Sequence, residues 1–371
     1  MKRTVYVIVF FFISIIQTFT TLSFKQKNEF KSGGLVEKVD SLVYSKMNRY
    51  NIPGLSIGII RNDSILLSKG YGLRSINSRK LVTENSIFHT ASISKLFTAV
   101  ATMKLIEQDS ISLDDKLIEI LPELNDQDKR IENITIKNLL NHTSGLPDIG
   151  NYHWDNNNQS DNSLKDYILG RRLKLDFDPS SEYQYSNLAY DVLGYVIEKV
   201  SGYSFDEFMK ENILNKSEMY TSDFRYFKIP DSLKTYPHSK RRITGKIYQR
   251  KTYPYTREHA PSSTLNSSAK DLSKWMISFL QTIDNAEAKN GILRMIEPAV
   301  SSNPHIGLGF QLSSIHSKKA IGHFGGDKGF RSYLIMIPDV KIGLVLLANC
   351  DYNEDFRQEI LHPIAELMLT K

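Results

Sequence analysis

The chain has 371 residues, of which 41% are hydrophobic and 24% are charged. A composition of this kind supplies a large buried core and excludes an intrinsically disordered protein. The formal net charge is +6, from 47 basic and 41 acidic residues, and because this excess is small and spread along the chain, it argues against nucleic acid as a partner. The single cysteine, Cys350, excludes an internal disulfide and is expected in the core.

The first 23 residues have the pattern of a secretory signal peptide. Lys2 and Arg3 precede an apolar run over residues 5–16, and residues 21–23 resemble a cleavage site. The apolar run is shorter than the ~20 residues that a membrane-spanning helix needs. We therefore expect cleavage of residues 1–23 and an exported protein, periplasmic or secreted. An uncleaved N-terminal anchor is the alternative and would be its only membrane contact.

A helix and a hairpin are the first elements predicted after a polar spacer, residues 24–34. The helix runs from Leu35 to about Tyr50. Two β-rich runs then flank Asn62-Asp63, residues that tolerate the positive φ of tight turns, and predict a hairpin over residues 54–72.

The middle of the chain is predicted to be helical, and its end returns to strands. Helical patterns dominate from about residue 91 to 281, strand patterns follow at 330–339 and 342–350, and a helix over about 356–369 closes the chain. This order predicts an α+β fold over residues 35–371, with a sheet built from both chain ends and a mainly helical inserted region.

The stretch HTASISKLFTAV, residues 89–100, contains a candidate nucleophile and base at the start of a helix. Residues three apart lie roughly 60° apart around a helix axis, so Ser92 and Lys95 share a face, whereas Ser94 points elsewhere. Free N–H groups at a helix start favour the negative charge that develops during acyl transfer. A lysine amine accepts the serine proton if burial or neighbours depress its pKa. An ordinary helix start is the alternative.

The S-x-x-K pattern alone is weak, because it occurs a second time, from Ser267 to Lys270. There, Ser268 as the cap of the following helix, with Asp271 at the third helical position, is the better explanation. The interpretation of Ser92 as a nucleophile therefore depends on partners elsewhere in the chain.

A partner motif, Tyr185-Ser186-Asn187, is the only Y-x-N in the chain and stands just before a predicted helix. Near a lysine ammonium, the tyrosine is either held as a phenolate or relays a proton, and the asparagine can bind both a lysine and a substrate carbonyl. The alternative is structural: a tyrosine packed at the helix entry, with Asn187 as the N-cap.

A third motif lies in the glycine-rich stretch GHFGGDKGF, residues 322–330, ahead of a strand pattern. Triplets of the form [KH]-x-G are common in this chain, but only His323 combines one with a glycine cluster and a following β-run. Glycines beside a strand indicate close approach of another group to the backbone.

In order and type, S-x-x-K, Y-x-N and [KH]-x-G resemble the motifs of serine β-lactamases and penicillin-binding proteins. The Y-S-N form is similar to the class C β-lactamase branch and its esterase, D-aminopeptidase and D,D-peptidase relatives. Phrases such as NLLNHTSGLPD, residues 138–148, and IGLGF, residues 306–310, extend the similarity over residues 35–370. The resemblance implies a β-lactamase/D,D-peptidase-like α+β fold with an antiparallel sheet flanked by helices.

The resemblance also implies a role for each motif residue. Ser92 would be the acylated nucleophile and Lys95 its proton acceptor or tuning group. Tyr185 would be a second general acid or base, and Asn187 would position Lys95 and the substrate. The family uses neither a metal nor an organic cofactor; in agreement, the nine histidines show no H-E-x-x-H spacing.

On the glycine-rich strand, the resemblance implies an oxyanion hole and a substrate-binding edge. The backbone N–H groups of Ser92 and Gly326 would bind the oxyanion, with Gly325 and His323 beside them. β-Lactamases usually carry a lysine where this chain has His323, a side chain mostly neutral at pH 7. The loss of that ammonium favours an esterase or peptidase over an antibiotic-hydrolysing enzyme, unless Lys328 or Arg331 supplies the charge.

A basic and aromatic segment, residues 224–255, allows two interpretations. It is either a lid that reads an anionic substrate such as peptidoglycan, or an exposed hairpin with aromatic packing beneath and basic tips above. The second interpretation is favoured, because charge runs usually form solvated surfaces.

The leading hypothesis is an exported serine hydrolase that forms an acyl-enzyme on Ser92. Its partner is a small-molecule or peptide substrate, including cell-wall-derived ones: an ester, a D-amino-acid peptide or a β-lactam-like amide. One alternative is a poorly deacylating sensor of cell-wall peptides or β-lactams. A purely structural descendant of the fold is the other, and the intact motifs argue against it.

Overall fold

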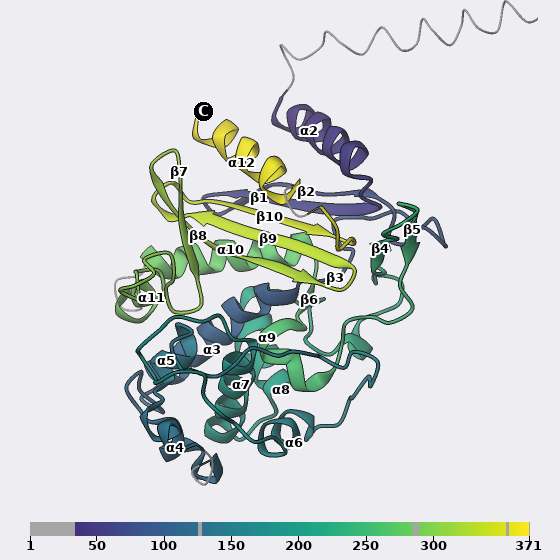
Figure 1. Cartoon of the computed structure of the whole chain (residues 1–371). Helices are drawn as coiled ribbons and strands as arrows, with labels where there is room; N and C mark the ends of the chain where they lie inside the picture. The colour runs from purple at the N-terminus through teal and green to yellow at the C-terminus, as the bar shows by residue number, and fades with distance from the viewer. Residues whose placement is uncertain (1–33, 125–127, 285–288, 354–355, 371) are drawn as a thin grey trace, which may run out of the picture. The chain divides into compact units, whose positions relative to one another are not determined.

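The computed structural model describes residues 34–124, 128–284, 289–353 and 356–370 (Figure 1). The predicted signal peptide and nearly all of the polar spacer lie outside these residues. Contacts divide the chain into two units, Met1–Arg49 and Tyr50–Lys371. In the first unit the structure describes little besides helix α2 (Leu35–Tyr50), which has the predicted bounds. No helix in the described ranges is long and apolar enough to cross a membrane.

Within the described residues, the second unit is built around a six-stranded antiparallel sheet that combines both ends of the chain (Figure 1). In spatial order its strands are β2 (Ser64–Gly72), β1 (Gly54–Arg61), β10 (Ile342–Ala348), β9 (Phe330–Ile337), β8 (Lys318–Asp327) and β7 (Gln311–Ile315). The predicted α+β fold, with its sheet drawn from both chain ends, is confirmed.

The two ends of the chain meet at strands β1 and β10, where Ile57 pairs with Leu346. Helix α10 (Ala269–Asp284) packs against these two strands, α12 (Phe356–Leu369) packs against β10 and β9, and Figure 1 shows the two helices on opposite sides of the sheet. Because both faces are covered, β1 and β10 are apolar and buried almost continuously instead of alternating. The predicted turn of the first hairpin is confirmed by a φ of 54° at Asn62.

The region between β2 and β7 is mainly helical, as predicted. In addition to α10, its helices include α3 (Ser94–Glu107), α4 (Leu117–Ile120), α5 (Ile136–Leu140), α6 (Ser163–Leu169), α7 (Asn187–Ser201), α8 (Phe205–Met209), α9 (Ala260–Ser263) and α11 (Lys289–Met295). Two small sheets pair β3 (Phe88–His89) with β6 (Asn266–Ser267), and β4 (His238–Lys240) with β5 (Ile247–Gln249).

Three glycines of the cluster, Gly322, Gly325 and Gly326, are part of strand β8. The hydrophobic pattern placed these glycines ahead of a strand, whereas the structure places them within one, as the resemblance implies. Glycine has low strand propensity, so the pattern misses this strand. Pairing with β9 holds these glycines in the strand instead: Gly325 pairs with Ser332 and Gly326 with Arg331. Cys350 is buried, as expected.

Candidate active site

Ser92 lies in a short 3-10 turn, Ala91–Ile93, immediately before α3. The preceding residue, Ala91, has a φ of 50°, a conformation that costs an L-residue about 1–3 kcal/mol. Hydrogen bonds beside the turn offset this cost: Thr90 donates its N–H and its Oγ1–H to the carbonyl of Leu265, both at 2.9 Å, and Ser332 Oγ donates to the carbonyl of Thr90 at 2.7 Å. The surrounding structure therefore fixes where Ser92 points.

Strand β8 approaches this turn so closely that Gly325 has no room for a side chain. A Cβ atom there would lie 2.3 Å from the carbonyl oxygen of Thr90 and 2.1 Å from Ser332 Oγ. At the next position, Gly326 is exposed, and the atoms nearest to a Cβ would be those of the flexible Arg331 side chain, at 3.4 Å. The predicted strand residues thus lie beside the turn that carries Ser92.

We expect Gly325→Ala to destabilise the fold by about 1–3 kcal/mol, because its methyl group overpacks against backbone. The kcat/KM per folded molecule should also fall, since the Ser92 turn has to shift. Urea unfolding and ester hydrolysis measure the two effects. Gly326→Ala is the matched control and should stay within about 0.5 kcal/mol of the parent. Equal stability of the two variants would contradict the close approach.

Ser94 has a structural role. It is fully buried, its Oγ donates to the carbonyl of Ala91 at 2.7 Å, and it accepts a hydrogen bond from the N–H of Leu265 at 2.9 Å. The Ser94 hydroxyl is therefore engaged both as donor and as acceptor, and it links the turn to the segment before β6. Ser92 is the serine of this stretch whose hydroxyl faces the lysine, as its spacing predicted.

The second S-x-x-K is the start of helix α10. Ser268 Oγ accepts the N–H of Asp271 at 3.0 Å, so the predicted cap is confirmed. The capping box is not formed as predicted, because the Asp271 carboxylate accepts hydrogen bonds from Thr221 and Ser222 instead. Tertiary partners outside the helix outcompete the local one.

Lys95 lies fully buried in the first turn of α3 with three hydrogen-bond partners. Its Nζ is 3.2 Å from Ser92 Oγ, 2.5 Å from Asn187 Oδ1 and 2.6 Å from the carbonyl oxygen of Ser262. Burial lowers the pKa of Lys95 to about 7, although nearby carboxylates, chiefly Asp191, favour the charged form. A neutral amine keeps two N–H donors for Asn187 and Ser262 and turns its lone pair toward Ser92, which is the geometry of a general base.

Tyr185 contacts the nucleophile from the other side. Its Oη lies 3.0 Å from Ser92 Oγ, and its ring is 5.1 Å from Lys95 Nζ. Burial raises the pKa of Tyr185 well above its ordinary value. Of the two predicted forms, the protonated phenol that relays a proton is therefore favoured over the phenolate.

Asn187 is not the N-cap of α7. Ser186 caps this helix, because its Oγ accepts the N–H of Ala189 at 3.0 Å, and α7 begins at Asn187 itself. Asn187 instead joins Lys95 to Asp148, whose Oδ1 accepts both the backbone N–H and the side-chain amide of Asn187, at 2.8 and 2.9 Å. Asp148 thereby orients the amide so that its oxygen faces the lysine. This carboxylate lies in a phrase quoted for the resemblance, but the sequence assigned it no role.

His323 is buried behind Tyr185, with 6.2 Å between the two ring centroids. Its Nδ1 contacts the carbonyl of Phe324 at 2.5 Å. Burial, together with the charge on Lys95, lowers the pKa of His323 to about 3, so the ring is neutral near pH 7. His142, which was not predicted, packs against Tyr185 with 4.5 Å between the ring centroids and is also held neutral by burial, which lowers its pKa. Neutral rings therefore surround the catalytic tyrosine candidate.

Arg331 does not replace the missing ammonium. Its guanidinium donates to the backbone carbonyls of Asp327, Phe330 and Asp351. In the register of β9, Arg331 alternates with Ser332, whose side chain faces the Ser92 turn. Arg331 therefore lies on the opposite face of the sheet from Ser92.

A buried pair, Asp191 and His259, holds α7 against the segment that ends in α9. Asp191 Oδ2 lies 2.7 Å from His259 Nδ1, and both side chains are almost completely buried. Rings of Tyr152, Trp154 and Tyr167 surround the imidazole. Since α9 supplies the Ser262 carbonyl to Lys95, the pair supports the lysine indirectly. Asp191 falls four residues after Asn187, a helical spacing that could have flagged it.

In the basic and aromatic segment, residues 224–255, the structure contains a hairpin and packed aromatic rings, as the favoured interpretation predicts. The rings of Tyr226 and Tyr253 stack at 3.7 Å, and Tyr253 packs against Phe330. Above them, the β4–β5 hairpin carries the basic residues, and Ile243 at its tip is 99% exposed.

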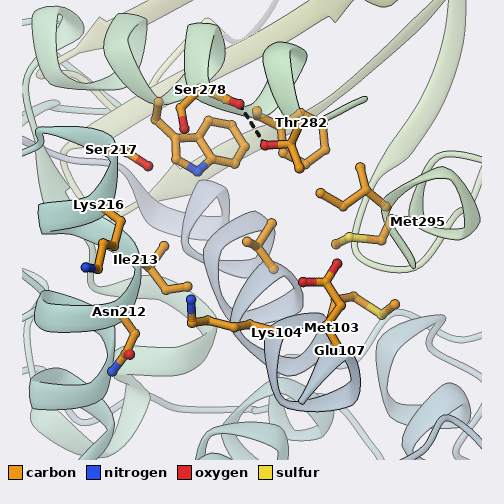
Figure 2. Close-up of a pocket in the computed structure, with 14 residues that line it drawn as sticks. Met103, Lys104, Glu107, Asn212, Ile213, Lys216, Ser217, Ser278, Thr282 and Met295 are labelled. Atoms are coloured by element: carbon orange, nitrogen blue, oxygen red, sulfur yellow. Dashed lines mark hydrogen bonds between the residues drawn. The ribbon is translucent and has the colours of Figure 1, made fainter. Parts of the chain in front are cut away.

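A separate cavity of about 140 Å³ lies near the other end of α3 (Figure 2). Figure 2 shows Met103, Lys104 and Glu107 of this helix among its lining residues, with Ile213 and Met295 on either side and Ser278 and Thr282 across from them. None of the predicted site residues lines it. In the part of the chain that the structure describes, no cluster of three or more histidine, cysteine or acidic side chains could hold a metal.

The chain as a whole is similar to several known proteins. The family model described as Beta-lactamase matches residues 39–368. Protein flp of Staphylococcus aureus (strain MW2) is 28% identical over 327 residues, which cover 84% of this chain and 63% of flp. Penicillin-binding protein 4* of Bacillus subtilis (strain 168) is 28% identical over 314 residues, covering 80% of this chain and 68% of that protein. The match thus spans less than two thirds of flp.

Solved structures show the same fold. The octameric penicillin-binding protein homologue from Pyrococcus abyssi aligns with a TM-score of 0.78 and 28% identity, covering 91% of this chain and 78% of that one. A class C β-lactamase aligns with a TM-score of 0.74 over 90% of this chain and 96% of that one. At 19% identity, this second likeness bears on the fold alone.

Proposed function

Since this chain belongs to the β-lactamase family, which includes serine hydrolases and penicillin-binding proteins, we propose that it hydrolyses esters or peptides through an acyl-enzyme on Ser92. One observation carries the proposal: Ser92 Oγ lies within hydrogen-bond distance of both Lys95 Nζ and Tyr185 Oη, at 3.2 and 3.0 Å. Nucleophile, base and proton relay are therefore already in contact before any substrate binds.

The proposed reaction has two steps. Neutral Lys95 accepts the hydroxyl proton as Ser92 Oγ attacks the substrate carbonyl, and the N–H groups of Ser92 and Gly326 bind the oxyanion. The bond to the leaving group then breaks while Tyr185 protonates that group, so the serine proton is transferred overall to the departing alcohol or amine. Water hydrolyses the resulting ester on Ser92, with the same groups acting in reverse order, and the free serine is regenerated.

The charge of the site favours neutral esters and D-amino-acid peptides over β-lactam antibiotics. His323 is neutral, and Arg331 is occupied by backbone carbonyls on the other face of the sheet. A substrate carboxylate therefore lacks the ammonium that a lysine at position 323 would supply. The signal-like N-terminus supports export to a periplasm or the medium, where cell-wall peptides occur.

A hydrolysis panel tests the proposal against the sensor alternative. It contains p-nitrophenyl esters, D-Ala-p-nitroanilide, a D-Ala-D-Ala peptide and a cephalosporin. We expect steady turnover of at least one ester or D-amino-acid substrate at a kcat/KM above that of the cephalosporin. A burst of one product per protein followed by no turnover would identify a sensor instead, because the acyl-enzyme would form without deacylation. No reaction with any substrate or with a fluorophosphonate probe would contradict the proposed function.

A further inference from the structure

Asp327 places a carboxylate on the same face of β8 as Gly325. It is the last residue of the strand, and alternation along β8 puts it two residues, about 7 Å, beyond the glycine that packs on the Ser92 turn. Its side chain is 10% exposed. It accepts hydrogen bonds from Trp154 Nε1 and Ser263 Oγ, both at 3.1 Å, and contacts His89 Nε2 at 3.3 Å.

The carboxylate belongs to the surroundings of Lys95. Ser263 adjoins Ser262, whose carbonyl accepts from Lys95 Nζ at 2.6 Å. Burial disfavours the charged form of Asp327, but the hydrogen bond and the charge of His89 outweigh it and lower the pKa, so the group is ionised near pH 7. Trp154 and Ser263 carry no charge, and among these three partners only His89, when it is protonated, neutralises the carboxylate. A fixed negative charge thus lies close to the nucleophile, and the reaction described above makes no use of it.

The position of Tyr185 indicates which part of a bound substrate would lie near the Asp327 carboxylate. Tyr185 lies next to His323, at one end of the strand segment that passes the nucleophile, and Asp327 lies at its other end. Because Tyr185 is the proton donor to the leaving group in the proposed reaction, the leaving group occupies the His323 side. The acyl group then extends along β8 toward Asp327.

We propose that Asp327 selects acyl donors that carry an ammonium group, such as esters or peptides of amino acids with a free amine. The inference rests on the proposed function. The side chain acts mainly through space, since its oxygens are already hydrogen-bonded.

Three p-nitrophenyl esters of similar length test the inference: the 6-aminohexanoate, the heptanoate and the monoadipate. They carry an ammonium, no charge and a carboxylate. We expect kcat/KM of the parent to follow that order. In Asp327→Asn, the ratio of ammonium to neutral ester should fall roughly fivefold, and the ratio of carboxylate to neutral ester should rise by a similar factor. Ratios within one variant do not depend on the fraction of folded protein.

Asp351→Asn is the matched control. Asp351 is 17% exposed and accepts hydrogen bonds from Ser239 and the N–H of Gly329, away from Lys95. Its replacement should leave the three-ester ratios of the parent unchanged. Raising the salt concentration gives a second measurement, because screening should compress the ratios in the parent and have little effect in Asp327→Asn.

The outcomes separate the two proposals. Turnover of the esters with unchanged ratios in Asp327→Asn, or equal shifts in both variants, would overturn the role of Asp327 and leave the serine hydrolase intact. Absence of turnover of all three esters by the parent, together with absence of fluorophosphonate labelling at Ser92, would overturn the proposed function and the selectivity with it.

Discussion

Replacing Ser92 with alanine is expected to abolish turnover of every substrate that the parent accepts, with kcat/KM lower by at least about four orders of magnitude. The substitution removes the hydroxyl oxygen that contacts both Lys95 Nζ and Tyr185 Oη, at 3.2 and 3.0 Å. The rest of the fold should be unchanged, because Ser92 is half-buried and its hydroxyl has no partner in the sheet. Steady-state kinetics measures the loss, and the intact mass of the protein shows whether an acyl adduct forms.

Ser94→Ala is the control for this experiment. Ser94 makes two buried hydrogen bonds that hold the turn, to the carbonyl of Ala91 and from the N–H of Leu265. Its loss should lower the free energy of unfolding by about 1–3 kcal/mol. Each folded molecule still carries Ser92, so labelling by a fluorophosphonate should persist. If Ser94→Ala loses labelling while Ser92→Ala retains it, the nucleophile has been assigned to the wrong serine.

The parts of the site that the sequence predicted are those set by local geometry. The three-residue spacing puts Ser92 and Lys95 on one face of a helix start, and this needs no knowledge of the rest of the fold. The sheet drawn from both chain ends follows in the same way from strand patterns at 54–72 and 330–350. The only Y-x-N of the chain then indicated Tyr185 and Asn187 as partners, and the resemblance gave each of them a role.

The parts that were missed depend on packing between distant segments. Asp148 orients Asn187 across 39 residues of sequence, and the Ser262 carbonyl reaches Lys95 across 167. Every residue has a backbone carbonyl, so the residue type cannot show which carbonyl binds the lysine. An aspartate in a loop has many possible roles. The pKa of Lys95 was likewise open, because its depression comes from complete burial, which only the assembled fold creates.

For His323 too, packing between distant segments decides what the sequence left open. Its residue type and strand position predicted a mostly neutral group at the substrate-binding edge. The structure places the ring behind Tyr185, where burial lowers its pKa and keeps it neutral. We therefore propose that the charge that distinguishes substrates comes from elsewhere on the strand. Asp327, four residues further on, is the ionised group that β8 presents there.

The rate of hydrolysis of a neutral ester is expected to rise with pH through about 7 and then level off. The pKa of Lys95 is lowered to about 7 by burial, and only the neutral amine can accept the Ser92 proton. Below that pH, kcat/KM should therefore fall about tenfold per pH unit. His323 does not contribute to this limb, because burial has already lowered its pKa to about 3. A pH–rate profile of a p-nitrophenyl ester measures the midpoint.

Lys95→Met tests whether this limb belongs to the lysine. Methionine fills a similar volume without a basic group, so kcat/KM should fall about 10²- to 10⁴-fold and the limb near pH 7 should disappear. Glu198, at the far end of α7, also has a pKa raised to about 7 by burial, and it is unchanged in this variant. Lys104→Met is the control: it lies on the same helix, α3, beside the separate cavity of Figure 2, and should leave the limb near pH 7 unchanged. A profile that keeps its midpoint in Lys95→Met would mean that another group, with Glu198 the first candidate, controls the rate, and that Lys95 only positions Ser92.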